Sequence, residues 1–171
     1  LITCAIFAPY LVRSDPYDLN LPAKLLPPSG EHWFGTDEMG RDIFSRIIMG
    51  SRVSIQVLAI VLACSLAIGV PLGLIAGFAG GWVDELVMRG TDVFLAFPPM
   101  VLAMAIAAAL GASLVNAVIA IVLVWWPGYA RLVRGQVLSI RDGLFVEAAR
   151  AIGASDLRVA FKHVLPNCIT P

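Results

Sequence analysis

The amino-acid sequence predicts an all-α fold, a polytopic bundle of membrane-spanning helices. Two observations carry this prediction, the overall composition and the distribution of charge. Hydrophobic residues make up 59% of the 171 residues and charged residues only 14%, with a mean hydropathy of +0.86; soluble domains have about 45–50% apolar and about 25% charged residues. No charged residue occurs between Arg52 and Asp84, or between Asp92 and Arg131. Because a bilayer core needs roughly 20 apolar helical residues, each interval is long enough to cross a membrane.

The same composition excludes several classes of protein. Lys and Arg number 12 and Asp and Glu also number 12, so no overall basic field indicates a nucleic-acid partner. The high apolar content excludes a disordered chain. The cysteines are odd in number and form no C-x-x-C pair, and the two histidines are far apart in the sequence. We therefore expect neither a disulfide framework nor a metal site.

The two ends of the chain and its longest polar segment are expected to flank the complete spans. Residues 1–12 are apolar but too short to cross a bilayer, so we expect them to be the end of a truncated transmembrane helix. Residues 13–54 are proline-rich in their first half, which favours extended chain and turns. The second half shows helical spacing and predicts an amphipathic helix at the membrane surface, with Thr36 or Asp37 as its N-cap. Residues 166–171 are expected to begin a further span.

Three complete transmembrane helices are expected within residues 55–129. The first lies near residues 55–78. The second uncharged interval would form a helix nearly twice as long as the bilayer is thick, so it should fold back on itself. The glycine-containing turn at residues 111–113 gives spans near residues 93–110 and 114–129.

Glycines and prolines mark two special places in these spans. Gly69, Gly73 and Gly77 recur every four residues, so they line one helix face that another backbone can approach closely. Simple packing is a commoner reason for such a stripe than a mobile contact. Pro98 and Pro99 remove two backbone donors and should distort the second span, and the freed carbonyls then need protein neighbours or a water-lined cavity. Such a distortion is compatible with a position beside a translocation path.

The basic residues give a weak preference for one topology. The loop at residues 79–92 and the segment after residue 130 lie on the same side and together hold more Lys and Arg than the opposite side. This favours a cytoplasmic location for the C-terminal segment, with residues 13–54 extracytoplasmic. Trp125, Trp126 and Tyr129 form an aromatic belt where the chain leaves the membrane.

The C-terminal segment, residues 130–165, shows more helical structure than a surface loop needs. A short helix near residues 144–152 ends at Gly153, a residue that can take the left-handed conformation that turns a chain. Ser155 should cap another helix, which should end at Pro166. Two short helices joined by a glycine turn outside the membrane indicate a docking element.

A motif within this segment resembles the EAA loop of ABC importer permeases. Glu147-Ala148-Ala149 is followed by Gly153 at the spacing of that loop, and later by Leu165-Pro166. The surrounding strings resemble the C-type membrane subunit of the dipeptide, oligopeptide and nickel permease family: WPGYAR at 126–131, EAARAIGAS at 147–155 and HVLPN at 163–167. The resemblance covers nearly the whole chain. His163 departs from the isoleucine of the broad EAA pattern but agrees with the peptide-type subgroup.

The resemblance implies a permease subunit of an ATP-driven ABC importer, a multi-pass protein of a bacterial or archaeal cytoplasmic (inner) membrane in contact with lipid. It implies as partners a second homologous permease subunit, cytoplasmic ATPase subunits and an extracytoplasmic solute-binding protein. Gly153 would set the angle between two coupling helices, Glu147 would offer a charge to the ATPase, and the two alanines would permit close approach. The implied ATPase-coupling residues are Glu147, Ala148, Ala149, Gly153, Ser155, Leu165 and Pro166.

The chain itself is not expected to be an enzyme or to hold a cofactor. Its only lysines, Lys24 and Lys162, do not belong to a G-x-x-x-x-G-K-[ST] motif, so ATP and Mg²⁺ are expected on the partner ATPase. One alternative is a secondary carrier or channel, which usually has ionisable residues within its spans. Another is a membrane-embedded enzyme, which needs catalytic groups at membrane depth. The expected spans contain neither feature, and the sequence does not define the solute or the residues that bind it.

Overall fold

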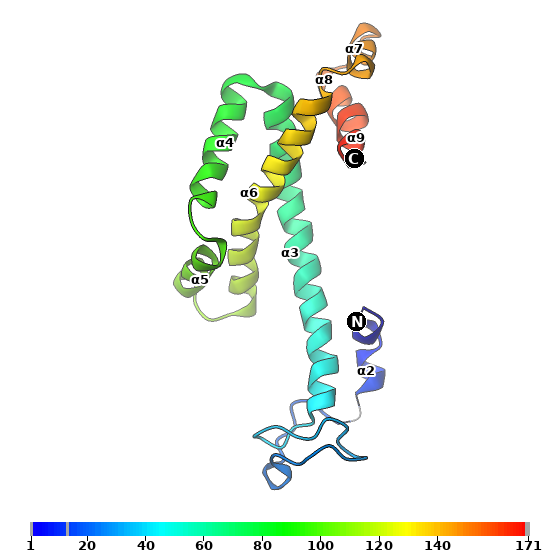
Figure 1. Cartoon of the computed structure of the whole chain (residues 1–171), viewed down its shortest axis with the longest axis vertical. Helices are drawn as coiled ribbons and strands as arrows, with labels where there is room; N and C mark the ends of the chain where they lie inside the picture. The colour runs from blue at the N-terminus through cyan, green and yellow to red at the C-terminus, as the bar shows by residue number, and fades with distance from the viewer. Residues whose placement is uncertain (1, 13, 170–171) are drawn as a thin grey trace. The chain divides into compact units, whose positions relative to one another are not determined.

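The computed structural model describes residues 2–12 and 14–169, and the all-α prediction is confirmed over these ranges (Figure 1). The contacts divide the chain into two units, Leu1–Ile60 and Val61–Pro171, which are described separately. In chain order the elements are α1 (Ile2–Ile6), α2 (Ala8–Leu11), the 3-10 turn η1 (Leu21–Ala23), α3 (Ile43–Ala79), α4 (Gly81–Leu95), α5 (Pro99–Leu110), α6 (Leu114–Ile140), α7 (Leu144–Ala151), α8 (Asp156–Arg158), the π-helical segment η2 (Val159–Val164) and α9 (Leu165–Ile169).

The first segment contains two short helices where we expected the end of one. α1 and α2 are separated at Phe7, and Pro9 lies in the first turn of α2. Because proline lacks a backbone N–H, it is tolerated in the first turn of a helix but not in its interior. A single helix through residues 2–11 is therefore interrupted at this point.

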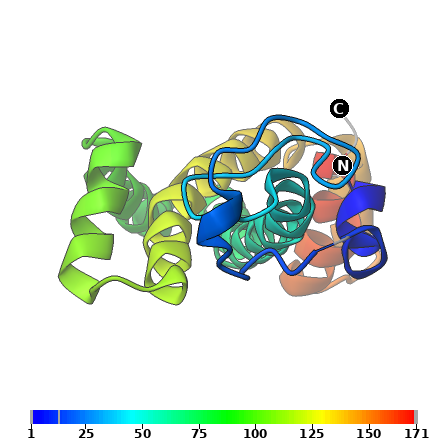
Figure 2. The same cartoon turned by 90° about the horizontal axis from the view of Figure 1, so that it is seen from below.

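Residues 14–42 form a coil that folds back on itself (blue to cyan in Figure 2). Gly35 and Gly40 adopt φ values of 74° and 75° in this coil. An ideal Cβ would lie 2.4 Å from the carbonyl oxygen of Leu26 at Gly35, and 1.7 Å from that of Asn20 at Gly40. Both the backbone conformation and the lack of space therefore require glycine at these turns.

The N-cap of α3 is Asp42, so the predicted caps Thr36 and Asp37 are wrong. The Asp42 carboxylate accepts a hydrogen bond from the backbone N–H of Ser45 at 2.7 Å, as an N-cap side chain does. Asp37 instead closes a turn within the coil, where its carboxylate accepts a hydrogen bond from the backbone N–H of Arg41 at 3.0 Å. Residue type alone does not separate the three candidates, because each is a good cap.

The Asp42 carboxylate is held in a buried hydrogen-bonded position. The residue is 4% exposed, and its Oδ1 lies 3.0 Å from Nδ1 of His32. Burial raises the pKa of Asp42, but hydrogen bonds from Ser45 and His32 lower it by more, so the pKa lies below its usual value. The cap is therefore anionic at neutral pH and faces the positive end of the helix dipole of α3.

α3 is one continuous helix of 37 residues, so the predicted amphipathic helix and the first predicted span are not separate elements. Nothing between them is a strong helix breaker. Gly50 costs only about 1 kcal/mol relative to alanine, and the Ser51 hydroxyl donates back to the Ile48 carbonyl at 2.7 Å. α3 is long and apolar enough to cross a membrane.

In the second unit, α4 and α5 both pack along α6 (Figure 1). α6 alone is long and apolar enough to be a span, whereas α4 and α5 pass that test only together and are bent by 85° to each other. The distortion predicted at Pro98 and Pro99 is thus confirmed. The loop predicted at residues 79–92 is wrong, because α4 occupies most of it.

The charges that suggested a loop at residues 79–92 are accommodated on a helix. Glu85 and Arg89 lie one turn apart on α4, with 3.5 Å between carboxylate and guanidinium. Asp84 and Asp92 of the same helix pair with arginines of α6, as described below. The ion pairs with α6 neutralise the charges of α4. Hydropathy alone, which does not see these distant partners, assigns the charged segment to a loop.

The turn predicted at residues 111–113 is confirmed. Gly111 has a φ of 95°, and the Ser113 hydroxyl accepts a hydrogen bond from the backbone N–H of Val115 at 3.3 Å. The Asn116 side chain donates to the Leu110 carbonyl at 2.8 Å, which closes the end of α5. From there α6 runs without interruption to Ile140, so the predicted span at 114–129 and the start of the predicted coupling loop are a single helix.

Candidate functional site

The candidate site is a C-terminal hairpin, residues 144–169, formed by α7, a turn, α8, η2 and α9. It follows α6 after a short turn at residues 141–143, where the sequence predicted a break. The last two residues of the predicted segment 166–171 lie outside the described residues. The hairpin contains every residue that the sequence assigned to coupling.

The turn between α7 and α8 depends on Gly153. This residue has a φ of 83°, which confirms the left-handed conformation predicted for it. The backbone N–H of Ala154 donates to the Ala149 carbonyl at 3.1 Å, the hydrogen bond of a Schellman motif at a helix C-terminus. A Cβ at Gly153 would meet nothing within 4 Å. Glycine is therefore required by the backbone conformation and not by a lack of space.

The second half of the hairpin differs from the prediction. Ser155 precedes α8 as expected, but its side chain makes no capping hydrogen bond. Pro166 does not end a helix, because α9 continues past it. η2, which precedes α9, is π-helical, and its closing bond runs from the backbone N–H of Leu165 to the Ala160 carbonyl. Pro166 lies in the first turn of α9, where a missing N–H is tolerated.

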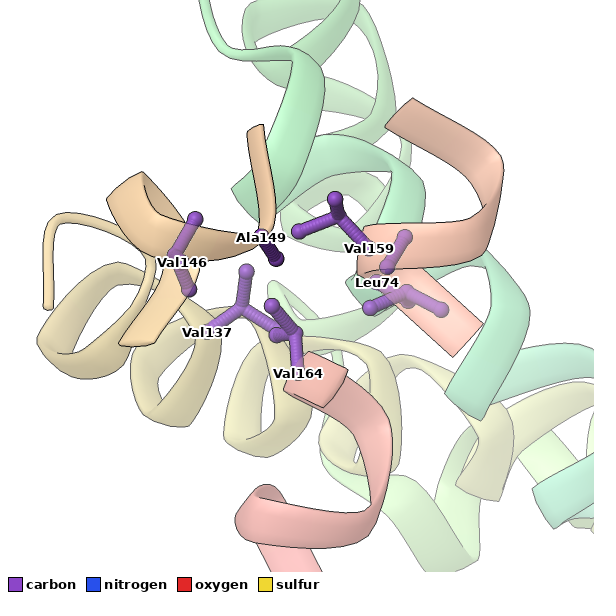
Figure 3. Close-up of a cluster of buried hydrophobic side chains, with 7 residues drawn as sticks. Leu74, Val137, Val146, Ala149, Val159 and Val164 are labelled. Carbon is purple, nitrogen blue, oxygen red and sulfur yellow. The ribbon is translucent and has the colours of Figure 1, made fainter. Parts of the chain in front are cut away.

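A buried apolar cluster fixes the hairpin to α6 and to the C-terminal part of α3 (Figure 3). Every member is 5% exposed or less. Full burial of a valine or leucine side chain stabilises the folded state by about 1.5–3 kcal/mol, so the cluster holds the hairpin firmly to α3 and α6. The members are Leu74 of α3, Val137 of α6, Val146 and Ala149 of α7, and Val159, Ala160 and Val164 of η2.

The opposite side of α7 is apolar and exposed. Leu144 is 84% exposed and Ile152 is 86% exposed, and Ala148, also exposed, lies between them at a spacing of four residues. Residues at this spacing share one helix face, and the exposed Glu147 lies beside them. We call these four residues the α7 outer face, which includes Ile152 directly after the last residue of α7. A surface helix usually exposes polar residues, so this face has the character of a docking surface.

The structure places the predicted coupling residues on two different sides of the hairpin. Glu147 and Ala148 belong to the α7 outer face, and the turn residue Gly153 is also exposed. Ala149 is buried in the apolar cluster, so its small side chain permits close approach of α7 to α6 in the same chain. Leu165 packs against the edge of that cluster, while Ser155 and Pro166 are exposed.

Sequence reasoning missed Leu144 and Ile152, the most exposed apolar residues of the α7 outer face. A signal for them exists in the sequence. Residues 144, 148 and 152 are apolar at a spacing of four, separate from Val146 and Ala149 on the buried side. A short helix with apolar residues on both sides packs one side within its own chain and leaves the other for a partner.

The glycine stripe of α3 faces α6 of the same chain. An ideal Cβ would lie 2.7 Å from the Trp126 carbonyl oxygen at Gly69, and 2.3 Å from that of Ala130 at Gly73. At Gly77 the nearest atom would be 2.8 Å away. The close approach predicted for this face is confirmed, and it joins α3 and α6 into one tightly packed pair.

Two ion pairs join α4 to α6. Arg134 donates to the Asp84 carboxylate through two nitrogens, at 2.5 and 2.6 Å, and Arg131 pairs with Asp92. All four residues lie outside the spans expected at residues 55–78, 93–110 and 114–129, which contain no Asp, Glu, Lys or Arg.

Arg141, just after α6, joins the end of that helix to the end of α3. Its Nη1 donates to the Gly77 carbonyl at 2.9 Å. A cation at a helix C-terminus interacts favourably with the helix dipole, typically by about 0.3–1 kcal/mol. The apolar cluster, the glycine stripe and Arg141 thus connect the hairpin to both long helices of this unit.

Comparison with known proteins relates the chain to membrane transport. The family model described as "Binding-protein-dependent transport system inner membrane component" matches residues 69–171. The dipeptide transport system permease protein of Alkalihalophilus pseudofirmus is 49% identical over 170 residues, 99% of this chain and 56% of that protein. The oligopeptide transport system permease protein of Bacillus subtilis is 41% identical over 169 residues, 99% and 55% of the two chains.

A third relative has a further solute in its name. The glutathione transport system permease protein of Pectobacterium atrosepticum is 40% identical over 171 residues, 99% of this chain and 57% of that protein. The chain thus spans a little over half the length of these curated relatives. The matched family region, residues 69–171, includes the glycine stripe, the bent pair α4–α5 and the entire hairpin.

Proposed function

Because this chain belongs to the family of binding-protein-dependent transport system inner membrane components, we propose that it is part of the membrane-spanning permease subunit of an ATP-driven importer. The names of its relatives, which refer to dipeptide, oligopeptide and glutathione transport, favour a peptide or a related small solute. α3, α6 and the bent pair α4–α5 form the membrane part. The chain acts as a transport subunit and not as an enzyme.

The α7 outer face is the observation that carries this proposal. Two leucine-sized side chains, Leu144 and Ile152, are more than four-fifths exposed on a hairpin that is otherwise firmly packed. We assign this face to contact with a cytoplasmic ATPase subunit, with Glu147 offering a charge at its edge. ATP and Mg²⁺ bind to that partner, since neither lysine of this chain lies in a phosphate-binding loop.

The contacts of the hairpin provide a route for coupling. A force on α7 reaches α3 and α6 through the apolar cluster, and Arg141 adds a polar link to the end of α3. Close-packed interiors transmit such displacements without much compression. Closure of the ATPase would in this way move α3 and α6 with the hairpin, while Gly153 maintains the angle of α7.

The remaining partners follow from the family and from the orientation favoured by the basic residues. A second homologous permease subunit completes the translocation path, and an extracytoplasmic solute-binding protein delivers the solute on the side of residues 13–54. The assembly belongs in the cytoplasmic membrane of a bacterium or archaeon. The named relatives are permease proteins of transport systems, which does not favour the alternative of a secondary carrier or channel.

The test removes the apolar side chains of the α7 outer face in the full-length subunit. Leu144→Ser with Ile152→Ser should weaken binding of the ATPase at least tenfold, because burial of each side chain is worth about 1.5–3 kcal/mol and about 1.4 kcal/mol corresponds to tenfold. Binding is measured by copurification with the ATPase from membranes, alongside ATP-dependent solute uptake and the amount of subunit in the membrane.

Phe161→Ser is the matched control, since Phe161 is 51% exposed on η2 and does not belong to α7. This variant should retain ATPase binding within a factor of two. Wild-type binding by the double variant would contradict the docking role of α7. Solute uptake that persists without any ATPase and follows an ion gradient would favour the carrier alternative.

A further inference from the structure

The bend between α4 and α5 leaves backbone acceptors without partners. Pro98 and Pro99 have no N–H to offer to the preceding turn. In the part of the chain that the structure describes, no backbone N–H donates to the carbonyl oxygens of Leu95, Ala96 or Phe97. Three consecutive carbonyls are therefore free, at the negative end of the α4 dipole.

The bend is not buried within the chain. Phe97 is 53% exposed, and Met100, at the start of α5, is 74% exposed. Non-helical backbone in a membrane protein is tolerated only where it is covered by protein or lines a water-filled cavity, because lipid cannot satisfy free carbonyls. The bend lies in the interval from Asp92 to Arg131 that carries no charge.

An ion pair that is open to solvent lies one helical turn from the bend. The backbone N–H of Ala96 donates to the Asp92 carbonyl at 2.9 Å, and the Asp92 side chain pairs with Arg131 of α6. The two side chains are 53% and 50% exposed, whereas those of the neighbouring pair Asp84–Arg134 are only 17% and 30% exposed. The first pair is therefore accessible to a ligand and the second is mainly structural.

The α4 side of the pair, next to Asp92, is polar and hollow. A depression of about 300 Å³ runs along α4 and is bordered by Asp84, Arg89 and Asp92. Ionisable residues in membrane helices usually face the bundle interior or a water-filled path. The free carbonyls, the accessible pair and the depression give the same indication, that this side of α4 faces water.

We propose that the α4–α5 bend, together with Asp92 and Arg131, forms a contact site for the charged ends of a peptide in the translocation path. This inference rests on the proposed import function and adds a site to it. The free carbonyls and the Asp92 carboxylate accept hydrogen bonds from the terminal ammonium group. The Arg131 guanidinium donates to the terminal carboxylate. The bound peptide is a zwitterion, so its ammonium group pairs with Asp92 and its carboxylate with Arg131. Each charge of the original ion pair therefore gains a new partner, and no charge is left unpaired in the site.

The test uses the complete transporter in proteoliposomes with its binding protein and ATP. Uptake of labelled dialanine, trialanine and glutathione is measured first, and the best-transported peptide is the probe. Asp92→Asn and Arg131→Gln should each lower its uptake at least tenfold, with subunit level and ATPase binding unchanged. Arg52→Gln is the matched control, since Arg52 is an exposed arginine of α3 that borders neither the bend nor the depression; its uptake should stay within twofold.

A charge-swapped variant separates solute contact from a structural role. Asp92→Arg combined with Arg131→Asp restores an ion pair between α4 and α6 but exchanges the positions of its charges. Uptake below a third of the wild-type rate supports the proposal, because the free carbonyls then lie beside a cation. Recovery of uptake to within twofold of wild type would overturn the proposal, because it would show that the Asp92–Arg131 pair only holds α4 and α6 together. Single variants that keep uptake within twofold would overturn it as well.

A second measurement is available where a charge variant does not reach the membrane. Ala96→Cys, a small change in a background without native thiols, should react with a membrane-impermeant thiol reagent, and the probe peptide should slow the reaction at least threefold. An unreactive or unprotected cysteine would overturn the proposal. Uptake of none of the three peptides by the wild type would overturn the proposed function itself, and this inference with it.

Discussion

A single methyl group at Gly73 tests how closely α3 and α6 approach each other. An ideal Cβ at this position lies 2.3 Å from the carbonyl oxygen of Ala130 and 2.9 Å from Cβ of Val133. The nearest atom belongs to the backbone of a helix, so a side-chain rotation cannot relieve the contact. Gly73→Ala should therefore force the two helices apart, and overpacking of this kind typically costs about 1–3 kcal/mol.

Gly135→Ala is the matched control for this substitution. Gly135 lies within α6, and a Cβ there would meet nothing within 4 Å. Both variants gain the same helix propensity, about 0.5–1 kcal/mol for glycine to alanine, so the difference between them isolates the steric cost. Gly135→Ala should be neutral or stabilising, whereas Gly73→Ala should be less stable than Gly135→Ala by about 1–3 kcal/mol.

The assay is thermal denaturation of the full-length subunit in detergent, followed by the loss of the folded peak in gel filtration. At about 2–4 °C per kcal/mol, the midpoint of Gly73→Ala should lie about 2–12 °C below that of Gly135→Ala. Equal midpoints for the two variants would refute the close crossing of α3 and α6. A midpoint of Gly135→Ala far below wild type would show that α6 has an additional neighbour at that position.

Three further predictions address the turn, the cap and the topology. Gly153→Val places a β-branched residue at a φ of 83°, which costs about 1–3 kcal/mol; ATPase copurification should weaken at normal membrane level, and Gly153→Asn, which tolerates this conformation better, should recover most of it. Asp42→Ala loses the hydrogen bond from Ser45 and should lower thermal stability by about 0.5–2 kcal/mol at pH 7. The pKa of Asp42 is lower in the folded than in the unfolded protein. The stability difference between Asp42→Ala and wild type should therefore be full at pH values above the unfolded-state pKa of about 3.9 and should disappear as the pH falls through the folded-state pKa. A stability difference that does not depend on pH would contradict a role for the charge. In a background without native thiols, Ser29→Cys should label from outside intact cells and Ser155→Cys only after permeabilisation, and equal labelling from outside would reverse the assigned topology.

Local features of the sequence were sufficient to predict the long helices and most of the turns. The uncharged intervals predict α3 and α6, and the two consecutive prolines predict the bend before α5. Gly111 and Gly153 were predicted to turn the chain, and both have positive φ values. In each case the deciding property belongs to one residue or to a short run of residues.

Contacts between distant residues decided the rest. α4 was predicted as a loop because the partners of its charges, Arg131 and Arg134, lie some forty to fifty positions away and cannot be recognised from spacing. Ala149 was assigned to the docking surface because a motif does not show which side of a helix packs against its own chain. Leu144 and Ile152 were missed for the same reason, since their exposure depends on the cluster beneath α7.

The π-helical turn before α9 makes the end of the hairpin sensitive to the number of residues as well as to their chemistry. A π-turn contains one more residue than the α-turn it replaces, and each residue of an α-helix corresponds to about 100° of rotation. Deletion of one residue from Val159–Val164 would regularise the helix and turn α9, with any helix that continues it, by roughly that angle. Substitutions in this segment are therefore expected to be tolerated among relatives far more often than single-residue insertions or deletions.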